Sequence, residues 1–129
     1  SGPDFHRKYT VLLVDDDIVT LKHIQKLLKK QGHIVYEAEN GKQAVEILEE
    51  EKFDCILMDI QMPVLDGVEA TKQIRSSKSK FKEIPIIALT AYAMAGDRKK
   101  FLNAGMDDYI SKPVDKEELL EVINKNLPA

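Results

Sequence analysis

The stretch FDCILMDIQMPVLDG, residues 53–67, joins a short apolar run to an acid, Asp59, and a Met-Pro turn. A continuous apolar run of this length, closed by turn residues, is typical of a strand buried in a parallel sheet. Asp66 with Glu69 three residues later matches a capping box, which predicts a helix that ends near Ser76. The stretch therefore predicts a strand, a turn and a helix, with an acid at the end of the strand.

The same unit repeats along the chain, because short apolar runs alternate with longer segments of helical periodicity. We predict strands at residues 10–14, 33–38, 53–58, 84–90 and 107–110. We predict helices from Ile18 to Gly32, from Asn40 onward, from Asp66 to Ser76, from Gly96 to Ala104 and from Asp115 onward. Parallel strands need crossover connections, and right-handed crossovers place helices on both faces of the sheet. The predicted fold is therefore α/β, one domain with a doubly wound, five-stranded parallel sheet.

Composition and charge are those of an ordinary globular domain. The 129 residues carry a formal net charge of −3, which argues against a general affinity for nucleic acid or anionic membranes. The single cysteine, Cys55, lies within an apolar run and is interpreted as a small core residue. His6, His23 and His33 lack metal-ligand spacing, so we interpret them as solvated or helix-surface side chains.

Polar residues stand at the carboxyl ends of four of the five predicted strands. In chain order they are Asp15, Asp16 and Asp17; Asp59; Thr90; and Ser111, Lys112 and Pro113. Ligands of open α/β sheets bind at the carboxyl ends of the strands. With a spatial order of 2-1-3-4-5, the second strand lies at an edge and the four polar ends are adjacent. The sequence therefore predicts one pocket with several carboxylates, one hydroxyl and one ammonium group.

The predicted pocket has the parts of a phosphoryl-transfer site. Clustered carboxylates repel one another, and a hard cation such as Mg²⁺ relieves that repulsion through oxygen ligands. Lys112 suits a phosphate oxygen or one aspartate, and the hydroxyl of Thr90 can donate a hydrogen bond to a phosphoryl oxygen. These groups favour phosphoryl transfer onto Asp59 as a carboxylate nucleophile. We therefore expect Asp59 to be exposed at its strand end, where it can reach a phosphodonor.

Four motifs, in order, resemble those of one family: LLVDDD (12–17), ILMDIQMPVLDG (56–67), IIALTA (86–91) and YISKP (109–113). As a set they resemble the receiver domain of two-component response regulators and hybrid histidine kinases, which has a flavodoxin-like fold. The resemblance covers residues 9–127 and leaves residues 1–8 as a lead-in or cloning remnant.

The resemblance implies a role for each pocket residue. Asp59 is then the phosphoacceptor, with Asp15 and Asp16 as the acidic pair. Asp16, Asp59 and the backbone carbonyl of Gln61 are the implied ligands of Mg²⁺. Asp17 falls where the family varies, and we interpret it as the cap of the first helix.

Further roles follow from the same resemblance. Thr90 and Lys112 are the implied switch hydroxyl and site lysine, and Tyr109 is the implied switch aromatic. A cis peptide bond between Lys112 and Pro113 is also implied. Gln61 and Tyr92 flank the path of a water that would hydrolyse an aspartyl phosphate, and they are expected to set its lifetime.

The sequence of residues 58–75 and 90–113 is most similar to that of receivers attached to hybrid histidine kinases. That similarity implies a histidine kinase domain as phosphoryl donor and a histidine phosphotransfer protein as a further partner, in the cytoplasm. The implied contact surface is formed by the fourth helix, the fifth strand and the fifth helix. The domain itself would catalyse only its own phosphorylation and dephosphorylation, without nucleic acid or membrane contact, whereas a longer parent would be a hybrid protein-histidine kinase.

Two alternatives remain at this stage. Residues 15–19, DDDIV, also match the D-x-D-x-V motif of haloacid-dehalogenase-type phosphatases, with Asp15 as nucleophile, Asp17 as acid/base and Asp59 incidental. Against that interpretation, the chain lacks room for a cap or substrate pocket, and GMDD (105–108) is a poor substitute for the late acidic metal motif of that family. The other alternative is a degenerate receiver that acts only as a docking module, although all the expected side chains are present.

Overall fold

The computed structural model describes residues 8–60, 66–76, 83–91 and 95–127, and for residues 95–98 it describes the backbone alone. Its strands are β1 (Thr10–Val14), β2 (Ile34–Ala38), β3 (Cys55–Asp59), β4 (Ile86–Thr90) and β5 (Asp108–Ser111). Its helices are α1 (Ile18–Lys30), α2 (Gly41–Glu50), α3 (Gly67–Ser76), α4 (Ala95–Ala104) and α5 (Lys116–Asn126). Each predicted element is present, and strands alternate with helices as predicted.

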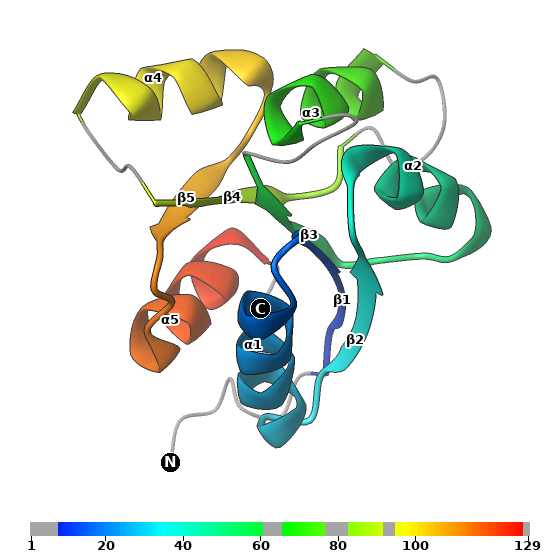
Figure 1. Cartoon of the computed structure of the whole chain (residues 1–129), viewed down its shortest axis with the longest axis vertical. Coiled ribbons are helices and arrows are strands. Elements are labelled where there is room, and N and C mark those ends of the chain that lie inside the picture. The colour runs from blue at the N-terminus through cyan, green and yellow to red at the C-terminus, as the bar shows by residue number, and fades with distance from the viewer. Residues whose placement is uncertain (1–7, 61–65, 77–82, 92–94, 128–129) are drawn as a thin grey trace.

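The strands form a five-stranded sheet in the order β2-β1-β3-β4-β5, and each adjacent pair is parallel. Figure 1 shows α1 and α5 on one face of the sheet and α2, α3 and α4 on the other. This arrangement confirms the predicted doubly wound fold. It also brings the carboxyl ends of β1, β3, β4 and β5 side by side, with β2 at an edge.

The core consists of two apolar clusters, one on each face of the sheet. Alternate residues of β1 supply both: Val11 and Leu13 pack with α1 and α5, whereas Leu12 and Val14 pack with α2 and α3. This two-sided burial explains why the inner strands read as continuous apolar runs. Cys55 is fully buried in the first cluster, which confirms its interpretation as a core residue.

Short polar side chains accept backbone hydrogen bonds at the starts of four helices, and at α3 the acceptor is Asp66, which binds the N–H of Glu69. The carboxylate of Asp17 accepts a hydrogen bond from the backbone N–H of Val19, and Asn40 and Asp115 cap α2 and α5 in the same way. Such caps satisfy backbone donors that the first helical turn leaves without partners. Asp17 is therefore the cap of α1, as predicted, and Gly32 with a φ of 90° follows the end of that helix.

Two residues differ from the interpretation of the sequence. Ile18 shares the apolar periodicity of α1 but is 62% exposed, and the buried side chains of the helix begin only at Leu21. His33 is half-buried rather than solvated, since its Nδ1 accepts a hydrogen bond of 3.1 Å from the backbone N–H of Tyr9. The two rings also stack, with centroids 5.5 Å apart. His23 lies on the surface of α1, as interpreted.

Candidate active site

The polar residues predicted to converge do so at the carboxyl edge of the sheet. Asp15 directly follows β1, Asp59 is the last residue of β3 and Thr90 is the last residue of β4. Lys112 directly follows β5. Because neighbouring parallel strands end at the same edge, four distant segments of the sequence supply one site.

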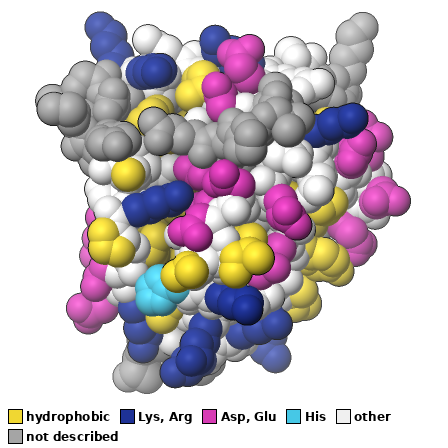
Figure 2. All heavy atoms as spheres, in the orientation of Figure 1, with side chains coloured by type: hydrophobic (Ala, Val, Ile, Leu, Met, Phe, Trp, Pro, Cys, Tyr) yellow, Lys and Arg dark blue, Asp and Glu magenta, His cyan; other side chains and the backbone are white. Residues whose placement is uncertain are grey.

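Three carboxylates form the centre of this site. Asp15, Asp16 and Asp59 each offer an oxygen atom within 4.8 Å of the others. Asp15 and Asp59 are buried, whereas Asp16 is exposed at the mouth. Figure 2 shows acidic side chains gathered near the middle of the face that Figure 1 presents, with apolar side chains beside them. An all-oxygen, carboxylate-rich donor set of this kind suits a hard divalent cation.

Lys112 supplies the positive charge of the site. Its ammonium nitrogen lies 2.8 Å from Oδ2 of Asp15 and 3.3 Å from Oδ1 of Asp59. Burial lowers the pKa of Lys112, but the hydrogen-bonding and charge interactions with the two aspartates outweigh it and raise the pKa overall. The lysine is therefore a stable cation at neutral pH. The structure also has the cis Lys112–Pro113 bond that the family resemblance implied.

Asp15 is held from two sides. Its Oδ1 accepts a hydrogen bond of 2.9 Å from the backbone N–H of Asp17. Its Oδ2 is buried and lies 2.8 Å from the ammonium nitrogen of Lys112, which is its one close positive partner among the described residues. A buried carboxylate oxygen in this state can accept a further positive ligand.

We expected Asp59 to be exposed, but it is buried. Its side chain is only 6% accessible to solvent, and Lys112 lies against its carboxylate. The expectation was wrong because it treated the end of β3 as open, whereas Asp59 lies buried beside the buried Asp15 and against Lys112. Among the three clustered carboxylates, Asp16 is the exposed one.

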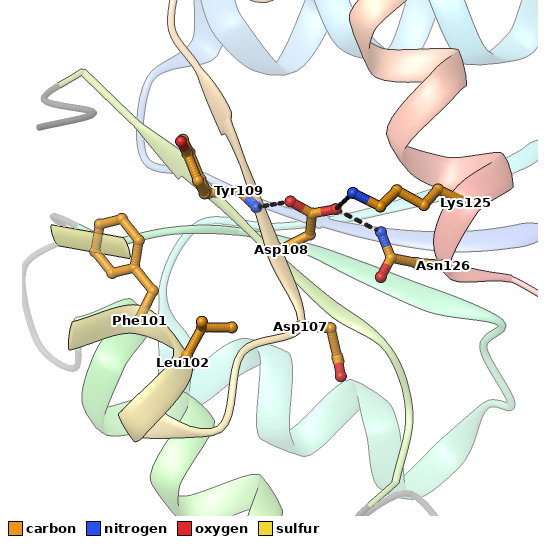
Figure 3. A pocket seen from close by; sticks show the side chains of 7 residues that line it. All are labelled: Phe101, Leu102, Asp107, Asp108, Tyr109, Lys125 and Asn126. Carbon is orange, nitrogen blue, oxygen red and sulfur yellow. Dashed lines mark hydrogen bonds and ion pairs between the residues drawn. The ribbon is translucent and has the colours of Figure 1, made fainter. Parts of the chain in front are cut away.

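The two predicted switch residues lie on the same face of the sheet. Thr90 is buried at the end of β4, and Tyr109 on β5 pairs with Ala88, two residues before Thr90. Tyr109 packs against the cluster beneath α4, with its ring 6.2 Å from that of Phe101. Figure 3 shows Tyr109 lining a pocket of about 170 Å³ between α4, β5 and α5.

The geometry disfavours the phosphatase alternative. Both carboxylate oxygens of Asp15, its nucleophile, are engaged, because Oδ1 accepts a hydrogen bond from the backbone N–H of Asp17 and Oδ2 pairs with Lys112. Asp17, its acid/base, is engaged in capping α1, and both a backbone N–H and the Thr20 hydroxyl donate to its carboxylate. These hydrogen bonds lower the pKa of Asp17, with the Thr20 hydroxyl as the largest cause, so it is a poor proton donor.

Gly67 is a site residue that the sequence interpretation missed. A Cβ atom there would lie 2.1 Å from the backbone oxygen of Asp59 and 2.8 Å from the Cα of Ile60. The first turn of α3 therefore rests directly on the backbone of the proposed acceptor. The Asp-Gly pair at 66–67 was a usable signal, since glycine at a helix start often marks a close backbone approach.

Two predicted residues, Gln61 and Tyr92, lie outside the described residues, so their roles rest on the sequence alone. None of the helices in the described part of the chain combines the length and the apolar character needed to cross a bilayer.

Comparison with known proteins shows the family to which the chain belongs. The response regulator receiver domain family matches residues 11–124. Among curated proteins, the hybrid signal transduction histidine kinase I of Dictyostelium discoideum is 47% identical over 123 residues, which cover 91% of this chain. The chain spans only 7% of the length of that relative.

Two solved structures are also similar. The receiver domain of the sensor histidine kinase PA1611 from Pseudomonas aeruginosa, with a magnesium ion in its active-site cleft, is 41% identical with a TM-score of 0.84. That match covers 93% of this chain and 98% of the other. The receiver domain of Ssk1 from Saccharomyces cerevisiae, crystallised with the histidine phosphotransfer protein Ypd1, is 35% identical with a TM-score of 0.84 over 92% of this chain and 88% of the other. This chain therefore belongs to the response regulator receiver domain family, the phosphoacceptor modules of two-component signalling, and is most similar to the receivers of hybrid histidine kinases.

Proposed function

We propose that Asp59 is the phosphoacceptor of this receiver domain. The observation that carries the proposal is Lys112, whose single ammonium group contacts both Asp15 and Asp59 in an otherwise acidic pocket. In the proposed step an oxygen of the Asp59 carboxylate forms a bond to phosphorus. The bond between phosphorus and the donor breaks, and the donor leaves with the bonding electron pair.

The donor set fits Mg²⁺, and Asp16 and Asp59 would hold it together with the backbone carbonyl of Gln61. The clustered carboxylates and the buried Oδ2 of Asp15 support this assignment, because both are relieved by positive charge. When bound, the ion would neutralise the negative charge shared by the carboxylates and the phosphoryl oxygens.

Lys112 and Thr90 would orient the phosphoryl group. Lys112 already bridges two carboxylates, so on phosphoryl uptake its ammonium can transfer a contact from Asp59 to a phosphoryl oxygen. The hydroxyl of Thr90 stands at the end of the next strand and can donate to another oxygen. Both residues would thus hold the group after transfer as well as during it.

Thr90 would also begin the conformational switch. When its hydroxyl turns toward the phosphoryl group, it vacates space on the sheet face that it shares with Tyr109. Inward movement of the Tyr109 ring would change the pocket shown in Figure 3 and thereby the surface of α4, β5 and α5. Comparing the conformers of the Tyr109 ring before and after phosphorylation tests this coupling, which identical conformers would contradict.

Gln61 and Tyr92 are proposed to set the lifetime of the phosphoryl group. The support is their sequence position, two residues beyond Asp59 and two beyond Thr90. A tyrosine ring can exclude water, and misplacing an attacking group by about 1 Å can slow a reaction about a hundredfold. Faster loss of phosphate from Tyr92→Ala than from wild type is the expected result, and equal loss would contradict shielding.

The proposed partners are a histidine kinase domain and a histidine phosphotransfer protein, in the cytoplasm. A phosphohistidine that reaches Asp59 must pass the exposed Asp16, so its host protein must cover the start of α1. Ile18 and Val19 stand there and are 62% and 73% exposed. Exposed apolar residues beside a reaction site are suited to a transient partner. We therefore propose that they contact the protein that carries the histidine.

Replacing Val19 with glutamine tests this surface. Transfer between the domain and a phosphorylated histidine phosphotransfer protein should slow about tenfold, because burying the side chain contributes about 1.5 kcal/mol. Uptake from acetyl phosphate, which needs no docking surface, should be unchanged. Ile34→Gln on β2 is the matched control, since Ile34 is also exposed but lies at the amino end of this edge strand. Equal slowing in both variants would remove Val19 from the contact.

The test of the acceptor is Asp59→Asn, which removes the nucleophile and nearly preserves its shape. We expect no phosphoryl uptake from acetyl phosphate or from a phosphohistidine protein, with an unchanged fold by circular dichroism. In wild type, peptide mapping should locate a hydroxylamine-sensitive adduct on Asp59. Labelling that persists in Asp59→Asn and disappears in Asp15→Asn would instead support the phosphatase alternative.

A further inference from the structure

His23 joins two segments of the chain that carry active-site residues. Its Nε2 lies 3.0 Å from the backbone oxygen of Val114, a residue 91 positions away. A carbonyl oxygen can only accept a hydrogen bond, so Nε2 carries the hydrogen and donates it. The neutral Nε2–H tautomer and the imidazolium both make this contact.

The carbonyl that His23 binds lies outside α5. Asp115 is the cap of that helix, and its own carbonyl accepts the first helical hydrogen bond, from Leu119. The carbonyl of Val114 comes one residue earlier, so helix formation does not satisfy it. Val114 is itself buried in the core. The imidazole of His23 therefore supplies a donor to a backbone acceptor that the local fold leaves open.

This contact fixes the far end of the segment that begins with Lys112. The backbone N–H of Lys112 donates to the carbonyl of Thr90 at 2.8 Å, which ties the start of the segment to β4. Only Pro113 separates Lys112 from Val114, whose carbonyl His23 holds. The segment is thus fixed at both ends, with the side chain of Lys112 directed to Asp15 and Asp59.

The other end of the contact lies on the helix that follows the acidic pair. His23 belongs to α1, the helix that begins immediately after Asp15 and Asp16 and is capped by Asp17. We propose that His23 is a positioning residue. Its hydrogen bond attaches the segment 112–114 to α1 and thereby keeps the ammonium group of Lys112 in contact with Asp15 and Asp59. This inference rests on the proposed phosphorylation of Asp59, and it assigns His23 no contact with the phosphoryl group.

The first experiment compares phosphoryl uptake from acetyl phosphate at saturating Mg²⁺ in wild type, His23→Leu and His23→Gln. Leucine keeps bulk and helix propensity but removes the donor, so uptake should slow about tenfold, less than the hundredfold that a 1 Å misplacement can cost. Glutamine keeps an N–H near the position of Nε2 and should restore at least half of the wild-type rate. The affinity for Mg²⁺, measured by titration, should stay within about twofold, because the proposed ligands do not include Lys112.

The second experiment asks whether His23 acts through Lys112. In a Lys112→Met background, adding His23→Leu should change the uptake rate less than twofold, because the group being positioned is absent. A tenfold effect in that background would overturn the proposal, as would a wild-type rate in His23→Leu. Loss of the fold in His23→Leu, seen by circular dichroism, would also overturn it, because the contact would then hold the fold and not Lys112. Absence of uptake in wild type would contradict the proposed function instead.

Discussion

At the scale of single residues, the site holds more negative than positive charge, and most of its charged groups are buried. Three carboxylates, those of Asp15, Asp16 and Asp59, meet one ammonium group, that of Lys112, so the described cluster carries a net charge of −2 when all four are ionised. Like charges a few ångströms apart destabilise the folded chain unless a cation joins them. The carboxylates that suit phosphoryl transfer therefore lower the stability of the metal-free protein.

The variant Asp16→Ala should show how much this repulsion destabilises the metal-free protein. The substitution removes one of three clustered carboxylates, so we expect the metal-free protein to gain roughly 1 kcal/mol of stability, or a few degrees in Tm. The affinity for Mg²⁺ should fall strongly, because a proposed ligand is lost. Thermal unfolding and a Mg²⁺ titration measure both effects. Glu37→Ala, an exposed carboxylate on the edge strand β2, is the control and should change neither. Unchanged Mg²⁺ affinity in Asp16→Ala would exclude Asp16 as a ligand.

At the scale of elements, most of the fold was predictable because its signals are local. Hydrophobic periodicity located the strands and helices, and Asp66, like the helix caps, accepts the predicted backbone hydrogen bond, from Glu69 at 2.9 Å. What could not be predicted depends on contacts between elements. Periodicity placed Ile18 on the apolar side of α1 without indicating that its side chain stays exposed at the start of the helix. Nor did it indicate that α3 would approach the Asp59 backbone closely enough to require Gly67.

The stability of Gly67→Ala shows whether helix propensity or the contact of α3 with the Asp59 backbone dominates, because the two change stability in opposite directions. Helix propensity alone predicts that alanine stabilises α3 by up to about 1 kcal/mol. The clash of its Cβ with the Asp59 backbone oxygen predicts the opposite, a loss of roughly 2 kcal/mol or more, because neither backbone segment can move freely. Urea unfolding measures the difference, with the exposed Gln73→Ala on α3 as the propensity control. A variant more stable than wild type by the propensity gain would show that α3 can shift without cost.

At the scale of the whole molecule, the two ends of the sheet differ in the interactions that they carry. The carboxyl ends of the strands carry the charged site, whereas the amino ends carry hydrogen bonds that hold the layers together. Arg75 at the end of α3 donates to the carbonyls of Gly105 and Ile84 and pairs with Asp107 at 2.9 Å. This network could not be predicted from local patterns, because its members are far apart in the chain and meet only when α3, β4 and α4 pack. Stability and chemistry can therefore be altered separately.

His33 makes the amino end of the sheet sensitive to pH. Burial is the main cause that lowers the pKa of His33 from 6.5, and the charge of Asp54 opposes it in part. The neutral ring accepts the backbone N–H of Tyr9 at Nδ1, and protonation of Nδ1 would remove that acceptor. The native state therefore favours the neutral imidazole.

Stability should consequently fall as the pH drops through the ordinary histidine range. Between the lowered folded pKa of His33 and the unfolded value near 6.5, the unfolded chain binds more protons, so the free energy of unfolding decreases with pH. The contribution of the neutral ring is complete above that window and lost below it. His33→Asn keeps an acceptor near Nδ1 but cannot titrate, so its unfolding free energy should change less than that of wild type between pH 7.5 and pH 5, values chosen to bracket the window. Both proteins share every other titrating group, including the active-site carboxylates, so the difference between them isolates His33. Urea unfolding of the metal-free proteins at the two pH values supplies the comparison, and an equal loss of stability in both would show that His33 keeps its ordinary pKa in the fold.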